Sequence, residues 1–286
     1  SWERLRALQR LVFGFGLAQV VLCGGAVAAA AAALGADIGV ALVIGAALTL
    51  SSTAVVLPVL RSRGRADSGA GQAAFAVLLF QDIAVAPILI AISLAGRGGS
   101  PAEAVGSLLL AVVALGALAA GLKLLLRPFM DHVARSRSSE LFLAACLLTI
   151  IAAGMIASAA GLSMALGAFV AGLLLAETEY RRAAEAMVEP FRGLLLGLLF
   201  VSIGIKLDVP LLLERPMLVL GIVALLVAGK AAIILALGSA FRAGRAAAVE
   251  AALLLAPAGE FAFVVLDQAT GLGLLPPALS ELVLVS

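Results

Sequence analysis

Three ionisable side chains lie deep inside strongly apolar stretches of the sequence: Asp82, Lys230 and Glu260. A charge at the centre of a membrane-spanning helix costs about 2.5–3.5 kcal/mol on insertion scales, so such residues are kept mainly where they face a bundle interior or a wet cavity. Asp82 lies about 17 Å along its apolar block if the helix rises about 1.5 Å per residue, which is near mid-membrane. A carboxylate at that depth can bind a proton or a monovalent cation in turn, because either one neutralises its charge. The sequence therefore predicts transient ion binding at Asp82, with Gln81 beside it.

Each of the three buried charges also has a purely structural interpretation. Asp82 could be locked in an ion pair, and Lys230 could be the structural partner of a carboxylate. Glu260 could bond to the backbone at a packing kink. These alternatives stay open at the level of the sequence.

Two of the apolar segments are interrupted by residues that break or bend helices. Residues 257–259, a Pro-Ala-Gly run, stand just before Glu260, and a proline removes a backbone donor and clashes with the preceding turn. Residues 49–53 interrupt an earlier block with hydroxyl side chains, although hydroxyls that bond back to helix carbonyls would also explain this run. One early and one late break indicate inverted repeats with a binding site where the breaks meet. The hydroxyl residues expected beside the ion are Ser51, Ser52 and Thr53.

The elements that carry these residues follow from composition. Hydrophobic residues make up 64% of the chain and charged residues 13%, whereas a soluble domain is nearer half apolar and a quarter charged. The excess recurs in blocks of about 20 residues, the length that crosses a hydrocarbon core of about 30 Å. We predict an all-α, polytopic transmembrane helix bundle. Its ten apolar blocks are at about 11–34, 38–60, 71–95, 103–126, 141–160, 162–178, 191–207, 216–241, 246–270 and from 277 on, the last cut short.

Short connections separate the blocks, and their Gly and Pro residues predict turns. These include Pro128, Gly161, Pro190 and Pro210. Separate blocks on either side of Gly161 keep lysine and arginine concentrated at alternate block ends. By the positive-inside rule the basic ends face the cytoplasm, which predicts a multi-pass protein of the inner membrane.

Several functional classes find no support in the sequence. It contains no HExxH, GxSxG or Walker-type motif, and its net charge of +2 indicates no nucleic-acid partner. Cys23 and Cys146 lie in apolar blocks without CxxC spacing, as small buried hydrophobes do. Gln19 is interpreted as a residue that hydrogen-bonds between helices. The sequence favours a secondary transporter over an enzyme, and no cofactor is expected.

Residues 74–84, which contain Gln81 and Asp82, closely resemble the Gln-Asp segment of Kef-type potassium/proton antiporters. These belong to the second monovalent cation:proton antiporter family. Residues 50–54 resemble that family's first broken helix. The other matching segments are residues 161–169, 190–200 and 259–265, with Lys230 at the family's buried lysine. The resemblance covers nearly the whole chain, with several long motifs in the right order.

This resemblance implies a sodium/proton-antiporter-like bundle with two discontinuous helices that cross near the transport site. It also implies a homodimer in which Asp82 alternately binds a proton and a cation. Some relatives carry two adjacent acids at positions 81–82. The single carboxylate here resembles the members that carry out potassium-selective, electroneutral exchange. The expected activity is K⁺ efflux coupled to H⁺ entry by alternating access, with Lys230 and Glu260 balancing charge in the crossing.

The resemblance further implies a longer protein. Residues 1–286 are interpreted as its transmembrane exchanger domain, without the N-terminal helices, the end of the last helix and a cytoplasmic nucleotide-binding regulatory domain. Glutathione-gated members carry an acidic regulatory stretch after the position of Tyr180. This chain keeps Glu185 and Glu189 there as a candidate regulatory loop, but residues 186–187 are Ala-Met where a Ser-Asp pair would stand.

Three other functions fit parts of the same pattern. A Na⁺/H⁺ antiporter of this fold would differ in the cation that drives proton flux. A passive cation channel, with Asp82 as a selectivity residue, would conduct without obligatory counter-flux. In a non-transporting scaffold, substitution of Asp82 would impair folding first.

Overall fold

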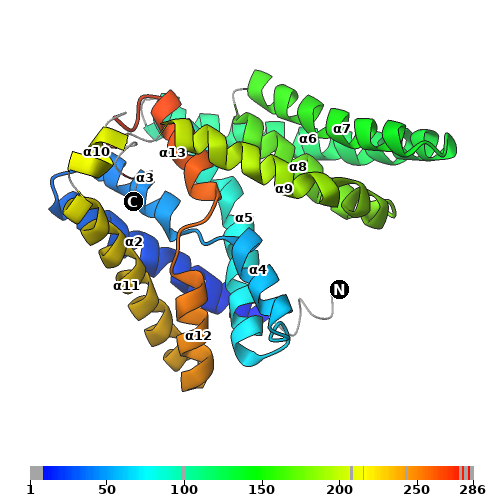
Figure 1. The fold of residues 1–286 in the computed structure, drawn as a ribbon. Coiled ribbons are helices and arrows are strands. Elements are labelled where there is room, and N and C mark those ends of the chain that lie inside the picture. Colours follow the sequence, from blue (N-terminus) through cyan, green and yellow to red (C-terminus); the bar gives the residue numbers. More distant parts are fainter. Residues whose placement is uncertain are drawn as a thin grey trace. The chain divides into compact units, whose positions relative to one another are not determined.

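The structure is a computed structural model that describes residues 9–97, 101–160, 162–206, 209–214, 216–241, 244–276, 279 and 283. The elements within these ranges are all helices, as predicted (Figure 1). In chain order they are η1 (Arg10–Gly16, a π-helix), α2 (Leu17–Ala33), α3 (Ile38–Thr49), α4 (Thr53–Ser62), α5 (Gly69–Arg97), α6 (Pro101–Arg135), α7 (Ser139–Ala159), α8 (Met164–Ala176), α9 (Arg181–Lys206), α10 (Val209–Glu214), α11 (Pro216–Ala240), α12 (Arg245–Leu255) and α13 (Phe261–Gly271).

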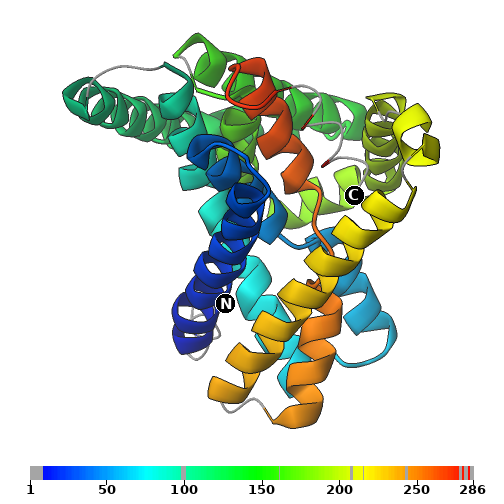
Figure 2. The ribbon, with the colours of Figure 1, turned by 90° about the vertical axis from the view of Figure 1, so that its left-hand side faces the viewer.

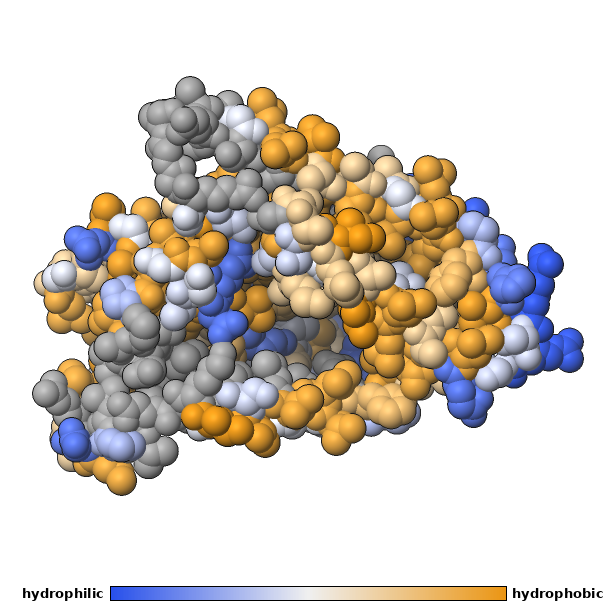
Figure 3. Space-filling model, turned by 90° about the horizontal axis from the view of Figure 1, so that it is seen from above, coloured by the Kyte–Doolittle hydropathy of each residue, from blue (hydrophilic) through white to orange (hydrophobic). Residues whose placement is uncertain are grey.

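The polytopic character is also confirmed. Among the described residues, six helical segments are long and apolar enough to cross a membrane: Leu11–Ala33, Ile38–Ser62, Gly69–Gly96, Val112–Arg135, Ser139–Ala159 and Pro216–Ala240. Many large apolar side chains are exposed, as expected where lipid replaces water. In Figure 3 hydrophobic residues cover much of the visible face, and hydrophilic residues gather at its right-hand end.

Some predicted turns are wrong, because the helices continue beyond the apolar blocks. Pro128 lies inside α6 and Pro190 inside α9, while Pro210 lies in the short helix α10. A proline removes one backbone hydrogen bond, and a transmembrane helix tolerates that loss where neighbouring groups replace it. The predicted break near Gly161 is correct, since α7 and α8 are separate helices. The tenth block lies mostly outside the described residues.

The chain forms two compact units, and the boundary between them falls within α5. Unit 1 comprises Ser1–Ile88 and Leu207–Ser286. Within it α3 packs against α2 and α13, and α11 packs against α2 and α12 (Figures 1 and 2). A Cβ atom on Gly45 of α3 would collide with the Gly24 carbonyl oxygen of α2, so this helix pair depends on a glycine. The core of unit 1 contains Phe15, Cys23, Val77, Leu78, Ile234 and Leu255.

Unit 2 comprises Leu89–Lys206. Its helix α7 packs against α6, α8 and α9. The core between these helices contains Met130, Phe142, Cys146 and Leu175. Both cysteines of the chain are free and buried, as predicted.

Candidate ion-binding site

Two interrupted helices of unit 1, α3–α4 and α12–α13, cross at their breaks. The Gly259 N–H donates to the Leu50 carbonyl oxygen at 2.9 Å. In the opposite direction the Ser51 hydroxyl donates to the Leu255 carbonyl oxygen at 2.6 Å. Each break therefore provides a donor for a helix-end carbonyl that lost its own partner when the other helix was interrupted.

A buried amide network holds the first break in place. Gln81 is 2% exposed, and its Oε1 accepts a hydrogen bond from the Ser51 N–H at 2.9 Å. Its Nε2 donates to Gln19 Oε1 at 2.8 Å and to the Thr49 carbonyl oxygen at 3.2 Å. Gln19 also donates to the Thr49 carbonyl oxygen at 3.2 Å, so its predicted role between helices is confirmed. Gln81 is thus fully committed to the backbone and the network around the break.

Asp82 differs sharply from its neighbour Gln81. It is only half-buried, and the hydrogen bond that it accepts from Thr53 Oγ1 is long, at 3.5 Å. Within the described part of the chain Asp82 forms no ion pair. Its carboxylate oxygens therefore retain capacity for a further partner.

Lys230 has the opposite character and is saturated with acceptors. It is 1% exposed, and its Nζ donates to the Leu48 carbonyl oxygen at 2.9 Å. The Leu50 and Pro257 carbonyl oxygens lie at 3.4 Å. These carbonyls belong to the C-terminal ends of α3 and α12, where the helix dipole places partial negative charge. No carboxylate among the described residues pairs with Lys230.

The three predicted hydroxyl residues occupy three different positions. Ser51 takes part in the crossing itself. Ser52 Oγ accepts a hydrogen bond from the Val55 N–H at 3.3 Å and so caps α4. Thr53 is the one that faces Asp82. Glu260 is half-buried at the start of α13 and makes no side-chain capping bond.

Comparison with known proteins places the chain. A family model described as "Sodium/hydrogen exchanger, transmembrane" matches residues 1–286. The chain belongs to this family. The resemblance read from the sequence and the expected helical bundle are therefore confirmed, and the crossing of α3–α4 with α12–α13 is the discontinuous-helix arrangement that the resemblance predicts.

Several curated relatives of this exchanger domain are antiporters by name. It is 45% identical over 292 residues to "K(+) efflux antiporter 1, chloroplastic" of Arabidopsis thaliana, which covers 99% of this chain and 24% of that protein. It is 41% identical over 284 residues to "Glutathione-regulated potassium-efflux system protein KefC" of Salmonella heidelberg (strain SL476), which covers 96% of this chain and 45% of the relative. The chain therefore spans less than half the length of these relatives.

The candidate regulatory residues Glu185 and Glu189 lie on α9 in unit 2, whereas the crossing belongs to unit 1. Both are exposed, and Glu185 pairs with Arg181 one helical turn away at 2.8 Å. Just before α9 the Tyr180 hydroxyl donates to Asp131 Oδ1 of α6 at 2.5 Å. This hydrogen bond raises the pKa of Tyr180, because the bond holds the phenolic proton. The segment before α9 is thereby attached to α6.

Proposed function

We propose that this exchanger domain carries the ion pathway of a monovalent cation/proton antiporter that moves K⁺ out of the cell as H⁺ enters. It would do so as a multi-pass protein of the inner membrane, without a cofactor in this chain. The names of its relatives support potassium as the cation. The family description supports Na⁺/H⁺ exchange on the same fold as the second candidate.

The observation that carries this proposal is the contrast between Gln81 and Asp82. Gln81 uses its amide to fasten the first helix break, whereas the adjacent carboxylate has one long hydrogen bond and no ion pair in the described part of the chain. A carboxylate retained for structure alone would be saturated by donors or paired with a cation. Asp82 instead lies beside the crossing with coordination sites to spare, as an ion-binding residue requires.

The ends of the broken helices explain why charges collect here. Asp82 lies beside Thr53, the first residue of α4, and Glu260 lies at the start of α13. Helix N-termini carry partial positive charge and stabilise anions, while the C-terminal ends of α3 and α12 are compensated by Lys230. The crossing thus holds a carboxylate inside the bundle without a permanent counter-ion.

Exchange then follows from competition at one carboxylate. Protonated Asp82 and cation-bound Asp82 are both neutral, so either form crosses between inward-open and outward-open states more easily than the bare anion. Thr53 Oγ1 and carbonyls freed at the breaks would replace part of the hydration shell of the ion. One monovalent cation exchanges for one proton, so the cycle moves no net charge.

Proton flux in proteoliposomes of the full-length parent protein tests this function. We expect an outward K⁺ gradient to drive saturable proton entry, and the flux to persist when the membrane potential is clamped at zero. A sodium gradient of equal size should drive less. Potassium movement without proton counter-flow would contradict antiport and indicate a channel, whereas flux driven only by sodium would favour the second candidate.

A further inference from the structure

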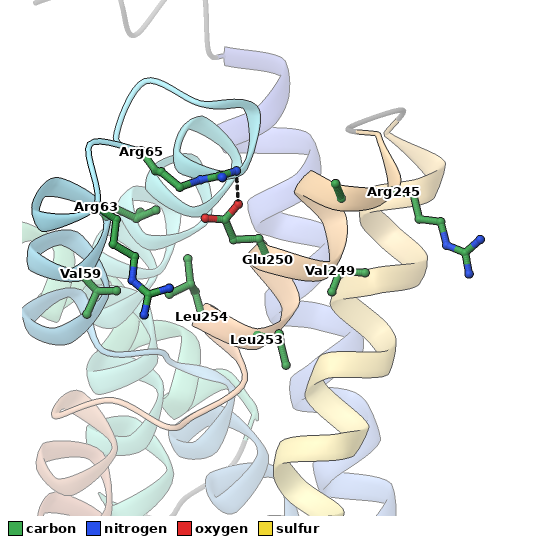
Figure 4. Close-up of a pocket in the computed structure, with 10 residues that line it drawn as sticks. Val59, Arg63, Arg65, Arg245, Val249, Glu250, Leu253 and Leu254 are labelled. Atoms are coloured by element: carbon green, nitrogen blue, oxygen red, sulfur yellow. Dashed lines mark ion pairs between the residues drawn. The ribbon is translucent and has the colours of Figure 1, made fainter.

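A pocket of about 730 Å³ opens between α4 and α12 (Figure 4). It extends from the ends of both helices that carry the basic loops toward the C-terminal end of α12. One wall is apolar and includes Val59, Val249, Leu253 and Leu254. Arg63, Arg65 and Glu250 line the same pocket. The pocket therefore combines an apolar wall with a basic rim.

The rim has a surplus of positive charge. Arg65 pairs with Glu250 at 2.5 Å, which neutralises the acid. The Arg63 guanidinium extends between Val59 and Leu254 in the view of Figure 4, and no carboxylate among the described residues pairs with it. Arg245 is the first residue of α12 and lies at the same rim, although its side chain is directed away from the pocket. An anionic group is the ligand that would complement an unpaired guanidinium beside an apolar surface.

The wall indicates which kind of anion fits. Leu253 is 68% exposed and Val249 is 40% exposed, and residues four apart lie on the same face of a helix. The face of α12 that carries Val249 and Leu253 runs from the arginine end of the helix toward its break after Leu255. It therefore leads away from the end assigned to the cytoplasm and into the bilayer. A soluble anion has no apolar part that could pack against this wall. An acidic peptide in the cytoplasm would contact the basic rim but would not reach Leu253 inside the bilayer.

We propose that this pocket binds an anionic phospholipid of the cytoplasmic leaflet. Its phosphate would bind the Arg63 guanidinium, and an acyl chain would lie along Val249 and Leu253. Anionic lipids concentrate on that leaflet, where nearby basic residues attract them. The bound lipid would bridge one half of each broken helix, α4 and α12, and so stabilise unit 1. This inference rests on membrane insertion and on the orientation predicted from the basic loops, and it does not depend on which ion is transported.

Thermal stability of the full-length parent in detergent, with added phosphatidylglycerol or phosphatidylcholine, tests the charge requirement. We expect phosphatidylglycerol alone to raise the melting temperature, and Arg63→Gln to lose at least half of that rise. Arg61→Gln is the matched control, since Arg61 is an exposed arginine of the same helix end that does not line the pocket. Equal losses in both variants, or an equal rise with phosphatidylcholine, would overturn the proposal.

Two further arms identify the occupant. Glycerol phosphate at millimolar concentration should give no comparable rise, and a full rise would instead assign the pocket to soluble phosphates. A photo-crosslinking amino acid in place of Leu253 should yield phospholipid adducts in native membranes that diminish in the Arg63→Gln background. Adducts to a protein segment would contradict a lipid occupant.

Discussion

Asp82 and Lys230 are both charges in a membrane interior, and their surroundings separate their roles. Lys230 reaches carbonyl oxygens of both interrupted helices. Asp82 accepts one long hydrogen bond from Thr53. Lys230 therefore stabilises the crossing, whereas the Asp82 carboxylate retains capacity for a further partner. A hydrogen bond to a charged group contributes about 1.5–3 kcal/mol, so the lysine makes a considerable contribution to the stability of this region.

Replacement of Lys230 tests its structural role. Lys230→Met leaves the carbonyl ends of α3 and α12 without their buried cation, so we expect a loss of about 3 kcal/mol of stability and a melting temperature lower by several degrees. Transport should fall with it. Lys123→Met removes an exposed lysine and is the control, expected to melt like the parent. Unchanged melting of Lys230→Met would show that the crossing does not need this cation.

Residue types alone predicted much of the candidate site. Asp82, Gln81, Lys230 and Glu260 were recognisable because polar groups are costly in apolar segments. The sequence could not separate the three neighbouring hydroxyls, since their directions depend on the angle at which α4 leaves the break. It also could not show that Gln19 reaches the first break, because that contact depends on how α2 packs against α3.

At the scale of elements, the crossing of two interrupted helices organises the site. Their breaks exchange hydrogen bonds in both directions, which requires the backbones to approach closely. A Cβ atom on Gly259 would lie 2.5 Å from the Ser51 carbonyl carbon and 2.7 Å from the Ser52 nitrogen. Backbone atoms cannot yield as a flexible side chain does, so only glycine fits at this point.

Substitution of that glycine should therefore separate the breaks. Gly259→Ala is expected to cost about 1–3 kcal/mol and to abolish most transport, because the crossing must open to admit the methyl group. The measurement is melting temperature together with proton flux. Gly271→Ala in α13 is the control, since no atom would meet its Cβ within 4 Å. A Gly259→Ala protein with normal stability and flux would refute the close crossing.

Sequence patterns predicted some helix boundaries correctly and others wrongly. The two breaks were predictable from residues 49–53 and 257–259, since polar and helix-breaking residues stand within apolar runs. Pro128 and Pro190 look like turns by the same rule, yet α6 and α9 continue through them. A lone proline bends or weakens a helix without ending it when neighbouring contacts hold both halves.

At the scale of the whole molecule, the exchanger domain matches its family from residue 1 to residue 286 but spans less than half the length of its curated relatives. The complete protein is therefore the proper subject for transport measurements. The proposed electroneutral exchange would be a property of the whole cycle, because it requires one carboxylate that is neutral in both loaded states. The proposed exchange thus depends on Asp82, the one residue that would bind both ions.

Proton flux driven by potassium in proteoliposomes of the parent and of Asp82→Asn measures this directly. Asparagine keeps the size of the side chain but has no carboxylate to titrate, so we expect flux at the level of empty vesicles with an unchanged melting temperature. Asp37→Asn, which removes an exposed carboxylate that makes no capping bond at the start of α3, should transport normally. Undiminished potassium-driven proton flux in Asp82→Asn would contradict the assignment of the ion site.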